Sequence, residues 1–262
     1  MNWARCPNCS ATLTGAYCSN CGQERIHPED LSARHFVREL ADEIANLHWR
    51  FKILRSLRGL LTPGFLTNEF LAGRRQSHLS PLKLYLVCAA LFFLSAPVAG
   101  FRLAAMVEQD PTGDLDRLVA TRVAARGLDP SLFSARFDIR VQSVYTISLG
   151  AGALALALLL QGLFRRHRSP YGAHLMFALH YVSFMYLVTA AAGIGRTWGA
   201  STSAAVLVAF LVIGGYLIAA LKRVYVESIG SLLWKSATVF VLTLIINNLA
   251  SAFAIRVTLA VV

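Results

Sequence analysis

Five apolar stretches, each long enough to cross a bilayer as a helix, constrain this chain more than any other feature of its sequence. They cover residues 79–98, 141–164, 174–194, 202–221 and 232–255. The hydrocarbon core of a bilayer is about 30 Å thick, and a helix needs about 20 mostly apolar residues to cross it. Charged residues make up only 15% of the chain, whereas soluble domains carry about a quarter. The sequence therefore predicts an all-α, polytopic membrane protein with about five transmembrane helices.

The segment before the first apolar stretch begins with two Cys-x2-Cys pairs, formed by Cys6, Cys9, Cys18 and Cys21. Four thiolates at about 2.3 Å close a tetrahedral zinc site and leave no position for a substrate, so the expected zinc is structural. Two disulfides or a redox-active thiol pair are the alternatives. Disulfides are rare in the cytosol, and a redox motif needs only one of the two pairs. The spacing predicts a small zinc ribbon over residues 1–25, with a hairpin at Thr14-Gly15 that joins the two turns.

Residues 30–75 read as helical but not as membrane-spanning. Apolar residues recur at intervals of three and four, and cations lie beside this stripe, as in a helix that lies in the headgroup region. Pro63-Gly64 is expected to break the helix, and a shorter one to follow from Phe65 to Leu71. The alternative is a neck whose apolar stripe packs on the membrane domain itself. The cations expected at the lipid surface, where anionic headgroups attract basic residues, are Arg55, Arg58, Arg74 and Arg75.

Residues 102–140 form a polar interlude with six Arg and six Asp or Glu. A short helix is expected from Asp114, whose carboxylate favours a helix start, to Arg126, with Gly127 as its C-cap. A second turn is expected to begin at Asp129-Pro130. The interlude is predicted to be an extracytoplasmic loop that covers the membrane domain.

Basic residues are distributed unevenly between the two sides of the predicted spans, and this bias predicts the orientation. One side collects Arg74, Arg75, Lys83, Arg165, Arg166, Arg168, Lys222, Arg223 and Lys235, and the other side's short segments carry only Arg196 and Arg256. The bias predicts a cytosolic N-terminus and an extracytoplasmic C-terminus. No cleavable signal peptide is visible, so insertion is expected to begin at residue 79.

A few polar residues lie within the predicted spans, where such groups are candidates for function. They are His174, His180, Tyr181, Asn247 and Asn248. His174 and His180 are six residues apart and lie on different helical faces, so they cannot bind one ion from this helix alone. Hydrogen bonds between helices, or a site for a solute, a proton or a lipid, are both compatible with these residues. Lys235 lies near a span end and is expected to reach the headgroups.

Four stretches of the chain carry a family resemblance. They read CPNC…YCSNCGQ, LRGLLTPGFLTNEFLAGRRQSHLSPLKLYL, HLMFALHYVSF and LKRVYVESIGSLLWKS. In this order they resemble an uncharacterised bacterial integral-membrane family, a domain of unknown function with an N-terminal four-cysteine ribbon. The resemblance implies the architecture described above, in a bacterial cytoplasmic (inner) membrane, and implies no activity.

The sequence lacks the motifs of several enzyme classes. It has no phosphate-binding glycine loop, no nucleophile elbow of a hydrolase and no His-Glu-x-x-His helix of a zinc protease. The favoured reading is a membrane scaffold or regulator, not an enzyme, whose ribbon and neck bind a cytosolic protein partner or anionic lipid. A small-solute or lipid transporter or channel is the alternative, and a lipid-modifying enzyme ranks below it. The net charge is +11, but the basic residues flank the apolar stretches, so no nucleic-acid partner is expected. An oligomer is left open.

Overall fold

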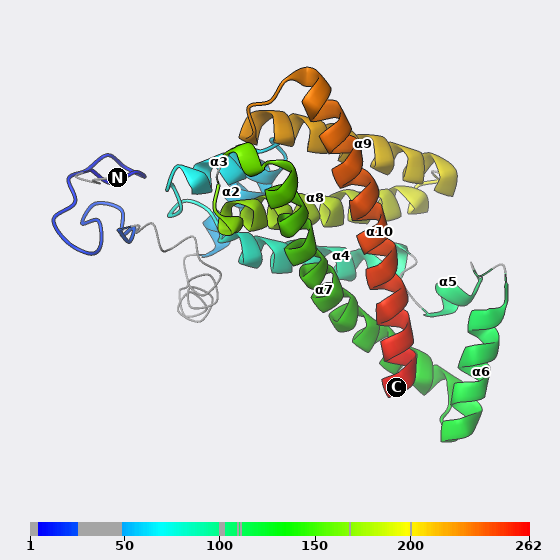
Figure 1. Ribbon diagram of the computed structural model, residues 1–262. Helices are drawn as coiled ribbons and strands as arrows, with labels where there is room; N and C mark the ends of the chain where they lie inside the picture. The colour runs from blue at the N-terminus through cyan, green and yellow to red at the C-terminus, as the bar shows by residue number, and fades with distance from the viewer. Residues whose placement is uncertain are drawn as a thin grey trace.

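The computed structural model describes residues 5–25, 49–99, 103–108, 110, 112–167, 169–199 and 201–262. From residue 49 onward the regular elements are all helical (Figure 1). They are α2 (Trp49–Leu60), α3 (Phe65–Leu71), α4 (Pro81–Ala99), α5 (Leu103–Glu108), α6 (Asp114–Arg126), α7 (Pro130–Leu163), the 3₁₀ turn η2 (Arg165–His167), α8 (Tyr171–Thr197), α9 (Thr202–Val224) and α10 (Ile229–Val261). The first part of the predicted neck, residues 30–48, lies outside the described residues.

Four helices, α7 to α10, are long and apolar enough to cross a bilayer. They coincide with four of the predicted spans, and the prediction of an all-α polytopic membrane protein is confirmed. The remaining predicted span corresponds to α4, which is apolar and 19 residues long. The chain is therefore an integral membrane protein, and the crossing by α4 stays a prediction.

Helix α8 lies at the centre of the membrane domain. Its apolar window is 72% buried, compared with 28% in α9 and 22% in α10. Helices α4, α7 and α9 pack directly on it, and α10 lies against α7 and α9 (Figure 1). The outer faces of α9 and α10 expose large apolar side chains, among them Leu207, Leu211, Leu249 and Phe253. Exposed apolar faces of this extent are expected where helices contact lipid.

Helix α7 begins earlier than the sequence predicted, because residues 130–140 continue it as one helix of 34 residues. The Asp129 carboxylate accepts the backbone N–H groups of Ser131 and Leu132, and Pro130 occupies the first turn, a position where its missing N–H costs nothing. Phe133 and Phe137, one turn apart, are fully buried. The predicted covering loop is thus largely helical where it is described, with α5 and α6 before α7. Helix α6 has the predicted bounds and the predicted Gly127 C-cap.

The described part of the neck packs on the protein. Helix α2 contacts α3 and α4, and its residues Ser56 and Leu60 are fully buried. Ser56 Oγ accepts the backbone N–H of Leu79 at 2.8 Å. Of the two expected arrangements, residues 49–60 therefore adopt the one in which the helix rests on the membrane domain.

The break at Pro63-Gly64 turns the chain against the end of α9. Gly64 has φ 69°, and a Cβ built on it would lie 3.0 Å from the carbonyl oxygen of Ala220. Asn68 donates to the carbonyl oxygen of Arg223 at 3.2 Å, and the Arg223 guanidinium lies 5.6 Å from the centre of the Phe65 ring. The corner thus fixes α3 to the end of α9.

Replacing Gly64 by alanine is expected to destabilise the protein more than the same change at Gly113. Both glycines precede a helix with the same left-handed backbone, φ 69° and 68°, but a Cβ at Gly113 meets nothing within 4 Å. Gly113→Ala should cost about 1 kcal/mol for the backbone, and Gly64→Ala should add about 1–3 kcal/mol for crowding. Thermal unfolding in one detergent measures both variants. Equal losses would show that the close approach to α9 is unimportant.

Candidate functional site

The four cysteines of the N-terminal segment converge. Their Sγ atoms all lie within 4.8 Å of one another, with 3.6 Å between Cys6 and Cys21 and 3.5 Å between Cys9 and Cys18. A tetrahedral site with metal–sulfur bonds of about 2.3 Å separates its sulfurs by about 3.8 Å, whereas a disulfide requires about 2.05 Å. These thiols are free. Their arrangement could hold one metal ion.

Two similar turns build this cluster. In each, the N–H of the first cysteine donates to a carbonyl oxygen five residues later, Cys6 to Ala11 and Cys18 to Gln23. Isolated β-bridges then close each turn on itself, between Arg5 and Thr12 and between Tyr17 and Glu24. The predicted hairpin at Thr14-Gly15 is not formed, because the bridges lie within each turn and not between the two. We refer to residues 5–25 as the four-cysteine unit.

Two thiols of the unit, those of Cys9 and Cys21, have shifted pKa values. The backbone N–H of Ala11, followed by the Asn20 side chain, lowers the pKa of Cys9 to about 6. Burial raises the pKa of Cys21 to about 12. A thiolate is the metal-binding form of cysteine, and a bound cation offsets the cost of burying that charge. The donor set therefore fits a thiophilic divalent ion.

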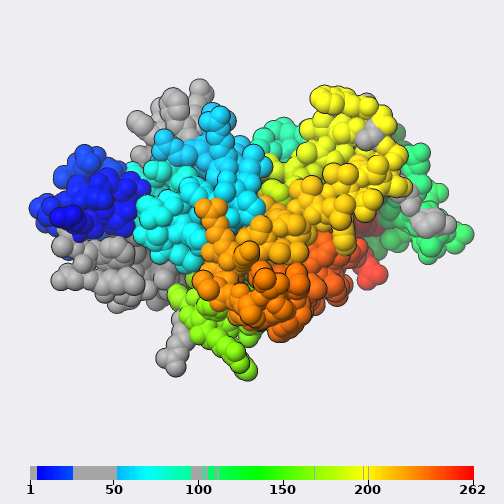
Figure 2. Space-filling model, turned by 90° about the horizontal axis from the view of Figure 1, so that it is seen from above, coloured from blue at the N-terminus to red at the C-terminus, as the bar shows by residue number. Residues whose placement is uncertain are grey.

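Gln23 joins the four-cysteine unit to the loop between α3 and α4, residues 72–80. Its Nε2 donates to the carbonyl oxygen of Gly73 at 2.5 Å. Its Oε1 accepts the backbone N–H groups of Arg75 and Gln76 at 3.2 and 3.3 Å. The residue is only 4% exposed. Figure 2 shows the unit, in dark blue, at one end of the molecule next to the cyan segment that includes this loop. Sequence reasoning missed Gln23, and its place directly after the Cys18–Gly22 turn was the available signal.

A cleft of about 630 Å³ lies between the four-cysteine unit, α2, α3 and the 72–80 loop. Its polar lining includes Asn8, Arg55, Arg58, Arg74, Ser77 and His78. The structure thus brings together three of the four arginines that the sequence assigned to the lipid surface. The fourth, Arg75, contributes its backbone N–H to the contact with Gln23. We call this space the basic cleft.

The basic cleft carries more positive than negative charge. Arg74 donates to both carboxylate oxygens of Glu69, at 2.8 and 2.5 Å, and this contact lowers the pKa of Glu69. Arg55 and Arg58 are exposed, and no ion pair joins them to a carboxylate among the residues that the structure describes. Two guanidinium groups therefore lack a protein counter-ion within the described lining.

His78 forms part of the wall of the cleft. It is 6% exposed, and its Nδ1 has no hydrogen-bond partner within the described structure. Burial lowers its pKa against the opposing charge of Glu69, and the charge of Arg55 lowers it further, so the ring is neutral at pH 7. The Phe65 ring holds it edge-on, with 5.9 Å between the ring centres. A buried polar atom without a partner calls for a water or a ligand atom.

The two histidines of α8 have different partners. His174 Nδ1 lies 2.7 Å from the Tyr225 hydroxyl, and the two rings stack. His180 Nδ1 lies 3.0 Å from Thr67 Oγ1 on α3. These contacts tie α8 to the α9–α10 connection and to α3, and the two rings do not share a site.

The other three candidate residues within the spans are also separate. Tyr145 donates to Asn247 Oδ1 at 2.7 Å, joining α7 to α10. Asn248 donates to the carbonyl oxygen of Leu244 on its own helix at 2.9 Å. Tyr181 is buried at 1% exposure. The Tyr145–Asn247 bond is typical of packing between helices, and the three side chains do not converge on one site.

Lys235 does not reach the headgroups as the sequence suggested. Its side chain is 8% exposed and its Nζ lies 2.6 Å from Glu227 Oε1. Ser231 donates to the other carboxylate oxygen at 2.5 Å, and His167 Nε2 lies 3.3 Å from Oε1. The Lys235 ammonium lies 4.6 Å from the centre of the Phe164 ring. The sequence placed Lys235 correctly near the helix end. Its counter-ion, Glu227, comes from the loop before α10, and the hydrophobic periodicity of a helix cannot reveal a partner in a loop.

Replacing Glu227 by glutamine is expected to cost about 3 kcal/mol, because it leaves the buried Lys235 ammonium uncompensated. Lys235 and Ser231 lower the pKa of Glu227 to about 2. The carboxylate therefore stabilises the fold above its unfolded pKa of about 4.3, and this contribution fades as the pH falls towards 2. Unfolding in detergent between pH 7 and pH 3 should show a larger loss in the parent chain than in Glu227→Gln, because carboxylates such as Glu69 titrate in both. Asp114→Asn, whose carboxylate is 77% exposed, is the control and should cost less than about 1 kcal/mol.

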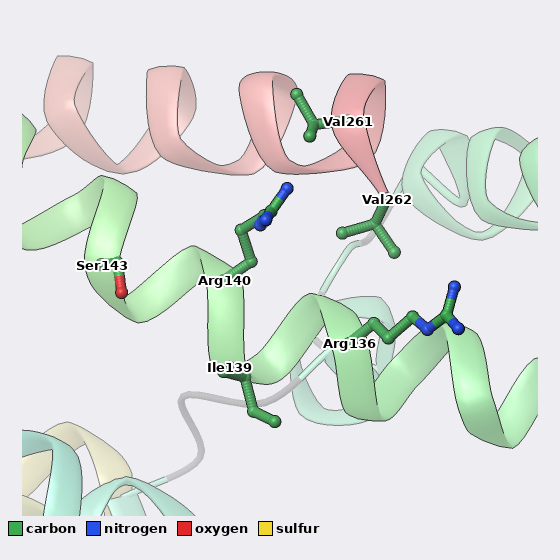
Figure 3. A pocket seen from close by; sticks show the side chains of 6 residues that line it. All are labelled: Arg136, Ile139, Arg140, Ser143, Val261 and Val262. Atoms are coloured by element: carbon green, nitrogen blue, oxygen red, sulfur yellow. The ribbon is translucent and has the colours of Figure 1, made fainter.

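A second hollow, of about 640 Å³, lies between the N-terminal part of α7 and the C-terminal end of the chain. It is lined by Arg136, Ile139, Arg140, Ser143, Val261 and Val262. Figure 3 shows Arg140 pointing from α7 towards the end of α10 and Arg136 lying nearer to Val262. Nearby, Arg126 donates to the carbonyl oxygens of Ala260 and Val261. Arg126 therefore helps to satisfy the last carbonyls of α10.

Residues 51–93 match the model of DUF3667, a protein family of unknown function. No curated protein matches the chain, and neither does any solved structure. The matched segment runs from α2 through α3 into α4. It contains every residue named above as lining the basic cleft except Asn8, which the four-cysteine unit supplies. The chain is thus similar to this family where the basic cleft is built.

Proposed function

We propose that this membrane protein binds a phosphate-bearing anionic headgroup in the basic cleft at its cytosolic surface. In this proposal it acts as a lipid-responsive scaffold or regulator, and the four-cysteine unit holds a structural zinc ion. The observation that carries the proposal is the convergence of Arg55, Arg58 and Arg74 on one cleft whose described lining contains a single carboxylate, that of Glu69.

The chemistry of the lining suits an anionic ligand better than a neutral one. Guanidinium groups offer paired N–H donors that match the oxygens of a phosphate. Glu69 already occupies Arg74, so Arg55 and Arg58 supply the charge for a ligand. The neutral ring of His78 lines the same cleft and adds a polar side chain beside the two guanidinium groups.

The location of the cleft supports a membrane lipid as the source of that phosphate. The cleft lies where α4 begins and where α3 contacts the end of α9 through Asn68 and Arg223. The last turn of α9 and the turn η2 carry the basic residues Lys222, Arg223, Arg165 and Arg166, as the positive-inside rule expects of a cytosolic surface. We place the N-terminus in the cytosol on this basis, and the membrane is proposed to be a bacterial cytoplasmic membrane.

Calorimetric titration of the full chain in neutral detergent tests the proposal. Short-chain phosphatidylglycerol is expected to bind at least tenfold more tightly than short-chain phosphatidylcholine, whose choline repels the arginines. Inorganic phosphate forms the third arm. If it binds as tightly as phosphatidylglycerol, the ligand is a free anion and not a lipid. Equal binding of the two phospholipids, together with no binding of phosphate, would refute the anionic site.

A further inference from the structure

We propose that metal loading of the four-cysteine unit controls whether the basic cleft can hold its anionic ligand. This inference rests on the proposed function of the cleft and adds a regulator to it. It follows from the way in which Asn8 and Gln23, one from each cysteine turn, reach the cleft and the loop that forms its wall.

The four-cysteine unit has little besides its thiols to hold it folded. Its own buried core consists of Cys6, Leu13 and Cys18, with Cys9, Ala11 and Cys21 partly buried around them. So small a core cannot offset the entropy of ordering the chain. Units of this kind fold when the metal binds and unfold when it leaves. The positions of Asn8 and Gln23 therefore depend on the metal.

Gln23 transmits the state of the unit to the 72–80 loop. The Cys18 N–H donates to the carbonyl oxygen of Gln23 at 2.8 Å, so the second turn fixes the backbone that presents the amide. Both ends of that amide are used, by Gly73 on one side and by Arg75 and Gln76 on the other. Loss of the unit would leave these three backbone groups of the loop without their partner.

The 72–80 loop is also the wall of the basic cleft. Arg74, Ser77 and His78 lie on it and line the cleft, and Arg74 is held in place by Glu69 of α3. The first cysteine turn adds Asn8 to the lining directly. The metal thus organises two sides of the cleft, while α2, with Arg55 and Arg58, packs on α3 and α4 independently of it. By linkage, a bound anion must strengthen metal binding by the same factor.

The test compares binding of short-chain phosphatidylglycerol to the full chain in neutral detergent, loaded with zinc, stripped with a chelator, and reloaded. We expect removal of zinc to weaken binding about tenfold, within the range of allosteric couplings, and reloading to restore it. Gln23→Ala should weaken binding to a similar extent while one zinc per chain is retained. Gln161→Ala, on an exposed part of α7, should change neither quantity.

The outcomes separate this inference from the proposed function. If the stripped protein and Gln23→Ala bind phosphatidylglycerol as tightly as the loaded parent, the proposed coupling between metal and anion is refuted. The proposed binding of the anion in the cleft is then unaffected. If the loaded parent shows no preference for phosphatidylglycerol over phosphatidylcholine, the proposed function fails first. Weakening by Gln23→Ala with simultaneous loss of zinc would show that Gln23 only stabilises the unit, and the proposed transmission through the loop would be overturned.

Discussion

The full chain carrying Cys18→Ser is expected to lose its metal and the folded structure of residues 5–25 while its membrane helices stay intact. Cys18 is 3% exposed, and its Sγ lies 3.5 Å from that of Cys9. A structural zinc site supplies about 10–16 kcal/mol of folding free energy in small domains. A serine oxygen is a far weaker ligand, and the rest of the core of the unit, centred on Leu13, cannot compensate.

Elemental analysis of the purified chain measures this effect, with circular dichroism as a check on helix content. The parent should carry one zinc per chain and Cys18→Ser close to none, with unchanged helical signal. Cys88→Ser is the matched control, because Cys88 is buried within α4 and takes no part in the cluster. Full zinc content in Cys18→Ser would contradict the four-thiolate site.

The double variant Arg55→Gln and Arg58→Gln is expected to lose about 30-fold in affinity for short-chain phosphatidylglycerol. Each arginine near an anionic headgroup contributes about 1 kcal/mol, and two such losses correspond to about 30-fold in the dissociation constant. The residues are exposed on α2, so their replacement should leave the fold intact. The remaining affinity should also depend less on salt concentration, because fewer charges are screened.

Arg165→Gln with Arg166→Gln is the control for this experiment. These two arginines are also exposed and change the net charge equally, but they lie in η2, outside the residues that line the basic cleft. Calorimetry should find parent-like affinity in the control. Equal losses in the two double variants would indicate general attraction to a basic surface and not a site.

Local signals in the sequence predicted several elements well. Helix α6 begins at Asp114 and ends at Gly127, as the charge and capping preferences predicted, and α3 has the predicted bounds. Both depend on residues next to each other in the chain. The start of α7 was wrong because residues 130–140 are too polar for a hydropathy pattern, and Phe133 and Phe137 are buried only by tertiary contacts.

The candidate site was predicted in its parts and not in its geometry. The four cysteines and Arg55, Arg58 and Arg74 could be chosen by type and position. Their convergence on one cleft with Asn8 depends on contacts such as that between Gln23 and Gly73, 50 residues apart in sequence. The place of Gln23 after the second cysteine turn hints at a structural role but does not name its partner, and a loop histidine such as His78 carries no recognisable pattern, so the contacts of both emerged only from the fold.

A structure of the zinc-loaded full chain in nanodiscs that contain phosphatidylglycerol tests the central claim most directly. The account predicts a lipid phosphate in the basic cleft, within hydrogen-bond distance of Arg55 or Arg58 and next to His78. A cleft that contains only solvent, with ordered lipid phosphates elsewhere on the protein, would contradict it.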